Sequence, residues 1–349
     1  MKPLLRAGAV ALVAAALSTG APAAAEPTTV RLAFASTFPG DMALIGEAAI
    51  ELAARISRAT GGEVELEFHE PGVLVPAAET LHAVSDGRID AGWGGAGWFS
   101  DVDTAFNMFS AVPFGPGVGE YMAWMYEGGG LEMARALFAE HDLYNLPCAL
   151  IPPEASGWFL KEIGEVSDLA GLRMRFFGLG AKVMERLGAE TRQLPPGDIR
   201  AALKAGTLDA AEFSLPRMDQ DLGLHTVAKY YYFPGWHQQA TFFDLYVNLA
   251  TWEALADRHK AIIELARGDM VRQTIASGEA AQWKAMREMQ AEGVEIRRWS
   301  PEIIAAMESA WNEVANEEAE RNAAFRWVYD SYKTFRSDYA IWHDHAYLK

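Results

Sequence analysis

Cysteine is almost absent from this sequence, because Cys148 is the only one among 349 residues. A single thiol cannot form an intrachain disulfide, so the folded state has to be stabilised by a hydrophobic core. Half of the residues are hydrophobic, which is enough for one large core or two modest ones. We therefore expect Cys148 to be a buried apolar residue.

Basic residues are also in short supply, since 30 Lys and Arg face 47 Asp and Glu, and the net charge is −17. A surface this acidic argues against binding to nucleic acid and to anionic membranes. Its overall charge would repel an anionic ligand as well. Any anion would have to be held by a local basic group or through a bound cation.

Long hydrophobic runs are missing apart from residues 7–17, which are shorter than the roughly 20 residues of a spanning helix. Lys2 and Arg6 precede this run and small residues, 23–25, follow it. This layout predicts a secretory signal peptide, cleaved after about Ala25, rather than a membrane anchor. Removing the signal peptide changes the net charge from −17 to −19. The presence of such a signal peptide predicts a periplasmic protein.

Familiar catalytic motifs are lacking too, because no G-x-S-x-G, P-loop or H-E-x-x-H pattern occurs. Residues 178–183 contain two glycines of a dinucleotide-binding fingerprint, but Val183 stands where the third should be. His343 and His345 lie near the C-terminus, where we expect them to be solvated. The sequence therefore gives no argument for an enzyme.

What the chain does contain is a regular alternation of strand and helix patterns. Period-2 alternation predicts strands at 28–36, 63–70 and 90–95, with helices between them. A second series of the same plan runs from Gly171 to Ser214. Two such units predict an α/β fold with two lobes. Helices are expected in the C-terminal part, at 252–277, 278–291 and 301–332.

Two arginines stand in an unusual place, inside the strand pattern GLRMRFFGLG at 171–180. We expect Arg173, at the strand start, to face solvent. Arg175 ends the strand before a glycine-rich turn, where ligands of α/β proteins bind and where a guanidinium can hold a carboxylate through two donors. The alternative is a structural ion pair with one of the many acids.

Two glutamates have apolar sequence neighbours. Glu212 ends the strand pattern TLDAAEF, and Glu154 lies between a Pro pair and Gly157-Trp158-Phe159. A buried carboxylate needs a cation or an arginine as partner. If they are not buried, both are solvated loop residues. Aromatic loops, among them those with Trp98 and Trp236, could wall a cleft around a small molecule.

Several motifs together resemble the extracytoplasmic solute-binding subunit of TRAP (tripartite ATP-independent periplasmic) transporters, over residues 26–345. They are VRLAFAS, SAVPFG, YEGGGLE, SGWFLKEI, DLAGLRMRFFGLG with the sequence that continues to Phe213, and VAKYYYFPGWHQQ. The resemblance is greatest to the branch that binds 2-oxo acids, lactate and related monocarboxylates. It implies a two-lobed periplasmic binding protein fold with crossing strands and a long helix that spans both lobes.

The resemblance also implies a division of the chain. The expected parts are a signal peptide, 1–25; a first lobe, 26–150 with about 241–275; a second lobe, 151–240 with about 276–315; and a C-terminal helical extension, about 316–349.

The family's carboxylate-binding arginine matches Arg175. In the 2-oxo-acid branch an acidic residue and the backbone carbonyl of the next residue bind a metal ion, and these match Glu212 and Phe213. Glu154 stands where the branch usually has Gln as a further metal ligand. Three carboxylates, one from the organic acid, would favour Ca²⁺ over Na⁺. The alternative is that no metal is present and Glu154 binds hydroxyl or amine groups of the ligand.

The expected ligand-binding set is completed by Trp98, Trp236 and Gln238. The resemblance implies delivery of the acid to a TRAP membrane permease. Two other functions stay open, an exported hydrolase with Glu154 and Glu212 as a carboxylate pair, and a sensor or scavenger without a permease. The C-terminal helix, with Trp327 and Tyr332 among its aromatic residues, is a candidate for pairing two copies.

Overall fold

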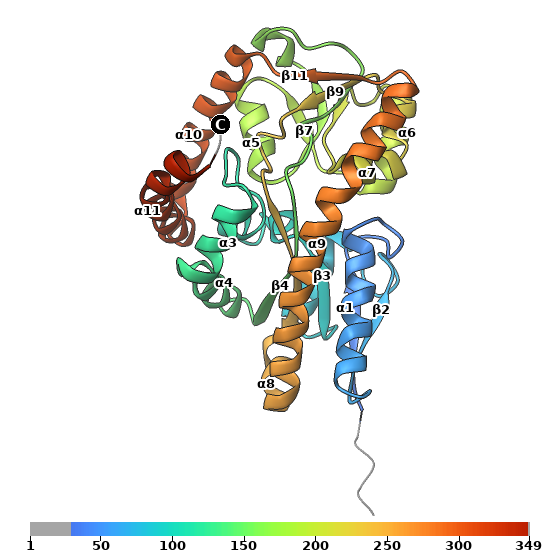
Figure 1. The fold of residues 1–349 in the computed structure, drawn as a ribbon, viewed down its shortest axis with the longest axis vertical. Helices are drawn as coiled ribbons and strands as arrows, with labels where there is room; N and C mark the ends of the chain where they lie inside the picture. Colours follow the sequence, from blue (N-terminus) through green and yellow to red (C-terminus); the bar gives the residue numbers. More distant parts are fainter. Residues whose placement is uncertain (1–28, 348–349) are drawn as a thin grey trace, which may run out of the picture.

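The computed structural model describes residues 29–347, which form two β-sheets with helices on both faces of each (Figure 1). The predicted signal peptide lies outside the described residues. The first sheet has strand order β2-β1-β3-β10-β4. Its strands are β1 (Val30–Ser36), β2 (Val64–His69), β3 (Ala91–Gly94), β4 (Leu143–Ile151) and β10 (Thr241–Asn248). β1 is parallel to β2 and β3, whereas β10 runs antiparallel to β3 and β4.

The second sheet has strand order β11-β9-β5-β8-β6-β7. It is built from short strands that appear late in the chain. They are β5 (Gly157–Phe159), β6 (Arg173–Arg175), β7 (Glu190–Arg192), β8 (Ala210–Ala211), β9 (Tyr230–Phe233) and β11 (Glu295–Arg298). The expected α/β fold with two lobes is confirmed.

Helices cover both faces of each sheet because alternate strand residues point to opposite sides. On the first sheet, Leu245 packs in the same cluster as helix α1, and Tyr246 packs in the cluster of α2, α3 and α4. These helices are α1 (Ile45–Ala59), α2 (Thr80–Ser85), α3 (Val118–Glu127) and α4 (Gly130–Ala139). On the second sheet, the helices are α5 (Gly178–Arg186), α6 (Pro196–Lys204) and α7 (Pro216–Asp221). Short 3-10 helices lie at Ala77–Glu79, Ala96–Phe99, Thr104–Phe109, Val166–Leu169 and Leu224–Thr226.

The chain passes between the sheets through two crossing segments. Residues 152–156 lead from β4 of the first sheet to β5 of the second, and residues 234–240 lead back from β9 to β10. The two segments are joined by backbone hydrogen bonds, from Glu154 N to Gln238 O and from Gly235 N to Glu154 O. Side chains on these segments therefore lie between the lobes.

A third connection is helix α9 (Asp257–Ala291), which follows the short α8 (Leu249–Ala254) and is 35 residues or roughly 52 Å long. It contacts α1 and β4 of the first lobe and α7 of the second, and Figure 1 shows it running along both. The predicted helix boundary at Gly278 is wrong. Gly278 lies inside α9. An added Cβ there would stand 2.6 Å from Cδ of Pro152, so a residue without a side chain is needed where the helix packs closely on the crossing segment 152–156.

The last two helices also connect the lobes. α10 (Pro301–Arg321) packs on α5, and α11 (Ala323–Ala346) turns back to pack on α3 and α4. The predicted continuous helix over 301–332 is broken at Asn322, whose side chain accepts hydrogen bonds from the backbone N–H groups of Ala324 and Phe325 and so begins a new helix. The predicted lobe boundaries and the extension from about 316 stay predictions.

Two further findings concern Cys148 and the length and apolar character of the helices. Cys148 is fully buried in β4, as expected, and burial raises the pKa of its thiol far above the usual value. Among residues 29–347, no helix combines the length and the apolar character needed to cross a membrane.

Candidate functional site

Arg175 lies at the end of β6 with its side chain completely buried. Its Nη1 donates to the carboxylate and to the backbone carbonyl of Glu212, both at 2.6 Å, and its Nε donates to the carbonyl of Leu194 at 3.3 Å. The guanidinium carbon also lies 5.5–5.9 Å from the rings of Trp98, Phe177 and Phe213. The ion pair that the sequence left open is therefore present, inside a wall of aromatic rings.

Arg173, two residues earlier, has a different environment. Its side chain is 45% exposed and pairs with Asp209, with Nη2 at 2.7 Å from Oδ1. The expectation that Arg173 faces solvent is confirmed. The two arginines of one strand thus differ in accessibility, which makes Arg173 a natural control for experiments on Arg175.

Both glutamates that the sequence singled out are buried in the same place. Glu212 is 0% and Glu154 is 2% exposed, so neither is a solvated loop carboxylate. Glu154 Oε1 accepts a hydrogen bond from the Ser214 hydroxyl at 3.0 Å. Glu154 Oε2 and Glu212 Oε1 have no hydrogen-bond partner in the described part of the chain.

His237 completes this cluster. Its Nε2 lies 3.4 Å from Glu212 Oε1 and 3.9 Å from Glu154 Oε2. One ligand atom from each of the three side chains lies within 4.8 Å of the others, the arrangement of a set that could hold a metal ion. Our sequence reasoning did not single out His237, although it lies between Trp236 and Gln238 in the motif YYYFPGWHQQ, which was the available signal.

The electrostatics of the cluster leave negative charge uncompensated. Burial raises the pKa of Glu154 well above its usual range, and the charge of Glu212 raises it further. Burial also raises the pKa of the neighbouring Asp219 to about 7, even though Trp158 and Tyr231 donate hydrogen bonds to it at 2.8 Å. One arginine faces three acids, so a cation would fit here both by charge and by oxygen ligands.

A small cavity lies beside Arg175, and most of the predicted ligand-binding set lines it. The lining includes Arg175, Glu154, Trp98, Phe213 and Gln238. The enclosed space is about 20 Å³, room for about one water molecule, so the two lobes are closed on each other. Side chains of both lobes contribute, with Phe38 and Phe243 from the first.

Trp236 is the exception in the predicted ligand-binding set, because it does not line this cavity, and the predicted metal ligand Glu212 does not line it either. The ring of Trp236 packs against Phe114, Phe176 and His237 at centroid distances of 5.5–5.9 Å. It stands behind the cavity wall and supports the ring of His237.

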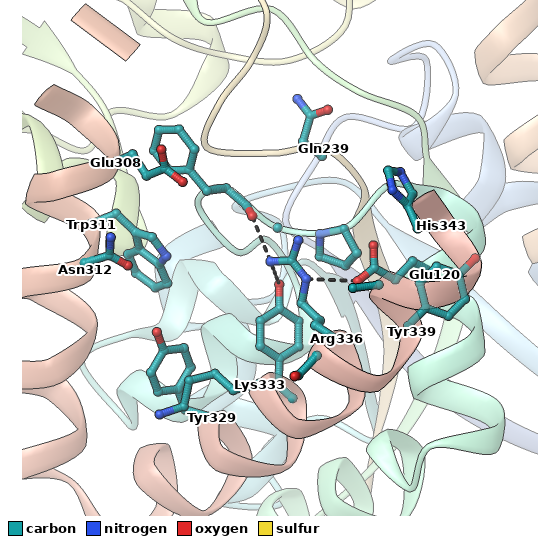
Figure 2. A pocket seen from close by; sticks show the side chains of 17 residues that line it. Glu120, Gln239, Glu308, Trp311, Asn312, Tyr329, Lys333, Arg336, Tyr339 and His343 are labelled. Carbon is teal, nitrogen blue, oxygen red and sulfur yellow. Dashed lines mark hydrogen bonds and ion pairs between the residues drawn. The ribbon is translucent and has the colours of Figure 1, made fainter. Parts of the chain in front are cut away.

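A larger cavity of about 620 Å³ lies elsewhere, between α3, α10 and α11. Figure 2 shows its lining, in which Arg336 donates to Glu120 Oε1 at 2.9 Å, to the Phe114 carbonyl and to the Tyr332 hydroxyl. Arg336 and Glu120, both partly buried, pair with each other here, whereas Glu154 Oε2 and Glu212 Oε1 near Arg175 have no hydrogen-bond partner among the described residues. The smaller cavity, beside Arg175, is therefore the candidate ligand-binding site.

Comparison with known proteins identifies the family to which this chain belongs. Residues 35–322 match the family model DctP, described as bacterial extracellular solute-binding protein, family 7. The chain belongs to this family. Its members are solute-binding components of transport systems that work outside the cytoplasm, and the resemblance to TRAP solute-binding subunits is confirmed.

Three relatives are informative. A monocarboxylate 2-oxoacid-binding periplasmic protein from Nostoc is 34% identical over 291 residues, 83% of this chain and 80% of the relative. A TRAP transporter solute binding protein from Bordetella bronchiseptica, a mixed occupancy dimer with copurified calcium and picolinate, has a TM-score of 0.89 and 34% identity over 91% of this chain and 95% of that one. A TRAP periplasmic solute binding protein from Pseudoalteromonas atlantica, with bound sodium and pyruvate, has a TM-score of 0.88 and 26% identity over 91% and 97%.

Proposed function

We propose that this protein captures a small 2-oxo acid, lactate or a related monocarboxylate in the periplasm and delivers it to a TRAP membrane permease. The observation that carries the proposal is that Arg175 and Glu154, both buried, line one cavity between the lobes, with buried Glu212 paired to Arg175 behind them. The names of the relatives add support, since they include a 2-oxoacid binder and structures with picolinate or pyruvate beside a metal ion.

Arg175 is proposed to hold the carboxylate of the acid. The guanidinium is anchored at the strand end by the carbonyls of Leu194 and Glu212, which fixes its plane without cancelling its charge. Its bond to the Glu212 carboxylate would be shared with, or replaced by, a bond to the incoming ligand. The rings of Trp98, Phe177 and Phe213 exclude water from this contact and so strengthen it.

A cation, Ca²⁺ or Na⁺, is proposed to share the ligand carboxylate with the protein. The side chains of Glu212 and Glu154 and the backbone carbonyl of Phe213 would hold it. When bound, the cation supplies the positive charge that the buried acids lack. Two glutamates plus the ligand favour a divalent ion, and the partnerless oxygens Glu154 Oε2 and Glu212 Oε1 support the assignment.

Closure of the lobes is proposed to be coupled to binding. The cavity wall combines Phe38 and Phe243 of the first lobe with Arg175 and Phe213 of the second, so a ligand that contacts both stabilises the closed form. The closed form would then dock on the permease. The same proposal includes export with cleavage after about Ala25. It also includes pairing of two copies through α11, where Trp327 and Trp342 are exposed.

No observation favours the hydrolase. The two glutamates share one buried cluster with His237, whereas glycosidases place their two carboxyl groups on either side of the bond that they cleave.

A thermal-shift screen over pyruvate, lactate, longer 2-oxo acids and picolinate, with and without EDTA, tests the proposal. At least one acid should raise the midpoint of unfolding by several degrees, and EDTA should reduce that shift where the cation is Ca²⁺ but not where it is Na⁺. The acid should be recovered unchanged after incubation. A screen in which no monocarboxylate shifts the midpoint would contradict the proposed function.

A further inference from the structure

His237 is held rigidly at the junction of the two lobes. It lies in the crossing segment 234–240 and is 3% exposed. Its ring packs edge-to-face on Phe176, with centroids 4.9 Å apart, and against Trp236 at 5.5 Å. Gly180 leaves room for it, because an added Cβ there would stand 3.3 Å from the His237 Cβ. Packing therefore fixes the direction of the imidazole.

The polar atoms of this ring have no partner. Neither Nδ1 nor Nε2 makes a hydrogen bond to any described residue, and the same holds for Glu154 Oε2 and Glu212 Oε1. A buried polar atom without a partner is costly, and here Nε2 and the two oxygens converge on one point. The contacts of Nε2 with the two carboxylates leave Nδ1 without a partner among the described residues.

The spacing of these atoms is that of ligands around one ion. Two atoms each about 2.1–2.5 Å from a metal are roughly 3.0–4.0 Å apart at the angles of octahedral or tetrahedral sites. His237 Nε2 lies 3.4 Å and 3.9 Å from the two carboxylate oxygens, inside this range. These two distances, with one ligand atom from each of the three side chains within 4.8 Å of the others, fit a single ion in contact with all three.

We infer that His237 is a direct ligand of the cation, which makes the protein's side-chain set two carboxylates and one imidazole. The inference rests on the cation assigned in the proposed function. An imidazole adds little for hard Na⁺ or Ca²⁺, but it binds first-row transition ions well. The site therefore retains Mn²⁺ or Zn²⁺ more tightly than Ca²⁺, and His237 determines that preference.

Mn²⁺ is the most direct probe, because its electron paramagnetic resonance reports both binding and bound nitrogen. Metal-depleted protein is titrated with Mn²⁺ and, in competition, with Ca²⁺, in the presence and absence of pyruvate. We expect Mn²⁺ to bind at least about tenfold more tightly than Ca²⁺. Pulsed measurements on the wild-type Mn²⁺ complex should show the nitrogen modulation of one coordinated imidazole.

Two variants separate His237 from other histidines. His237→Asn should weaken Mn²⁺ binding by about tenfold or more, change Ca²⁺ binding by less than about threefold, and remove the nitrogen modulation. His82→Asn, a substitution of an exposed histidine on α2, should change neither. The nitrogen signal is read on the wild-type protein, so the inference is tested even if His237→Asn folds poorly.

The outcomes distinguish the role of His237 as a metal ligand from the proposed presence of a cation. Mn²⁺ binding without nitrogen modulation, or an unchanged preference for Mn²⁺ over Ca²⁺ in His237→Asn, overturns the role of His237 and leaves the cation in place. Failure of every cation to bind the wild-type protein overturns the cation as well.

Discussion

At the scale of single residues, Asp219 links stability to pH. It is fully buried, and its pKa is raised from 3.8 to about 7, chiefly because burial disfavours the charged form. An acid with a raised pKa in the folded state is more favourable when protonated, so its stabilising contribution is present at low pH and is lost as pH rises from about 4 to 7. Without ligand or cation, the free energy of unfolding should therefore fall across this range.

Asp219→Asn isolates this contribution from the general effect of the acidic surface. Chemical denaturation between pH 4.5 and 8 should give a shallower dependence in the variant. Its absolute stability falls because the amide nitrogen that replaces Oδ2 cannot accept the hydrogen bonds from Trp158 Nε1 and the Tyr231 hydroxyl. Equal slopes in the variant and the wild-type protein would show that Asp219 is already charged in the folded state.

The resemblance to the 2-oxo-acid branch implies that Glu154 stands where a Gln is usual, and we expect its charge to affect which ion is bound. Glu154→Gln keeps the volume and one acceptor oxygen but removes one negative charge from the cluster. We expect Ca²⁺ affinity to fall by about tenfold or more and Na⁺ affinity to change less. Calorimetric titration checks this, with Glu308→Gln, exposed on the wall of the larger cavity, as control. Unchanged Ca²⁺ affinity in Glu154→Gln would remove Glu154 from the ion site.

At the scale of the elements, α9 depends on one glycine for its contact with a crossing segment. Gly278→Ala would place a methyl group 2.6 Å from the Pro152 ring, two residues from Glu154. We expect a net loss of stability of about 1–3 kcal/mol, because overpacking outweighs the better helix propensity of alanine. Ligand affinity should fall as well, because the segment that carries Glu154 shifts.

Gly268→Ala in the same helix is the matched control. Nothing lies within 4 Å of an added Cβ there, so this variant should gain about 0.5–1 kcal/mol from helix propensity alone. Thermal unfolding of both variants, followed by circular dichroism, checks the pair. Equal stabilisation of the two would mean that α9 does not press on Pro152.

The elements also show how far the sequence could be interpreted. Strands such as Val64–His69 and the placement of Arg175 at a strand end were predictable, because a period of 2 and a following glycine are local signals. The continuity of α9 through Gly278 was not, because the reason for that glycine is a contact with Pro152, 126 positions earlier. His237 was missed for a similar reason, since its two acidic neighbours come from distant segments.

At the scale of the whole molecule, the lobes are closed and leave about 20 Å³ beside Arg175. An organic acid needs more room than one water molecule, so entry requires the lobes to separate. We expect ligand-free protein in solution to populate an open form, and acid plus cation to shift it towards the closed one. Small-angle X-ray scattering should show a smaller radius of gyration on ligand addition. An identical radius in both conditions would contradict closure on the ligand.

The central claim is that the buried guanidinium of Arg175 holds the carboxylate of the transported acid. Isothermal titration of the best acid from the screen into Arg175→Ala and Arg173→Ala tests it most directly. Arg175→Ala should lose about 2–5 kcal/mol of binding free energy, roughly 30-fold to several thousand-fold in Kd, while Arg173→Ala binds like the wild-type protein. Wild-type affinity in a folded Arg175→Ala variant would contradict the account.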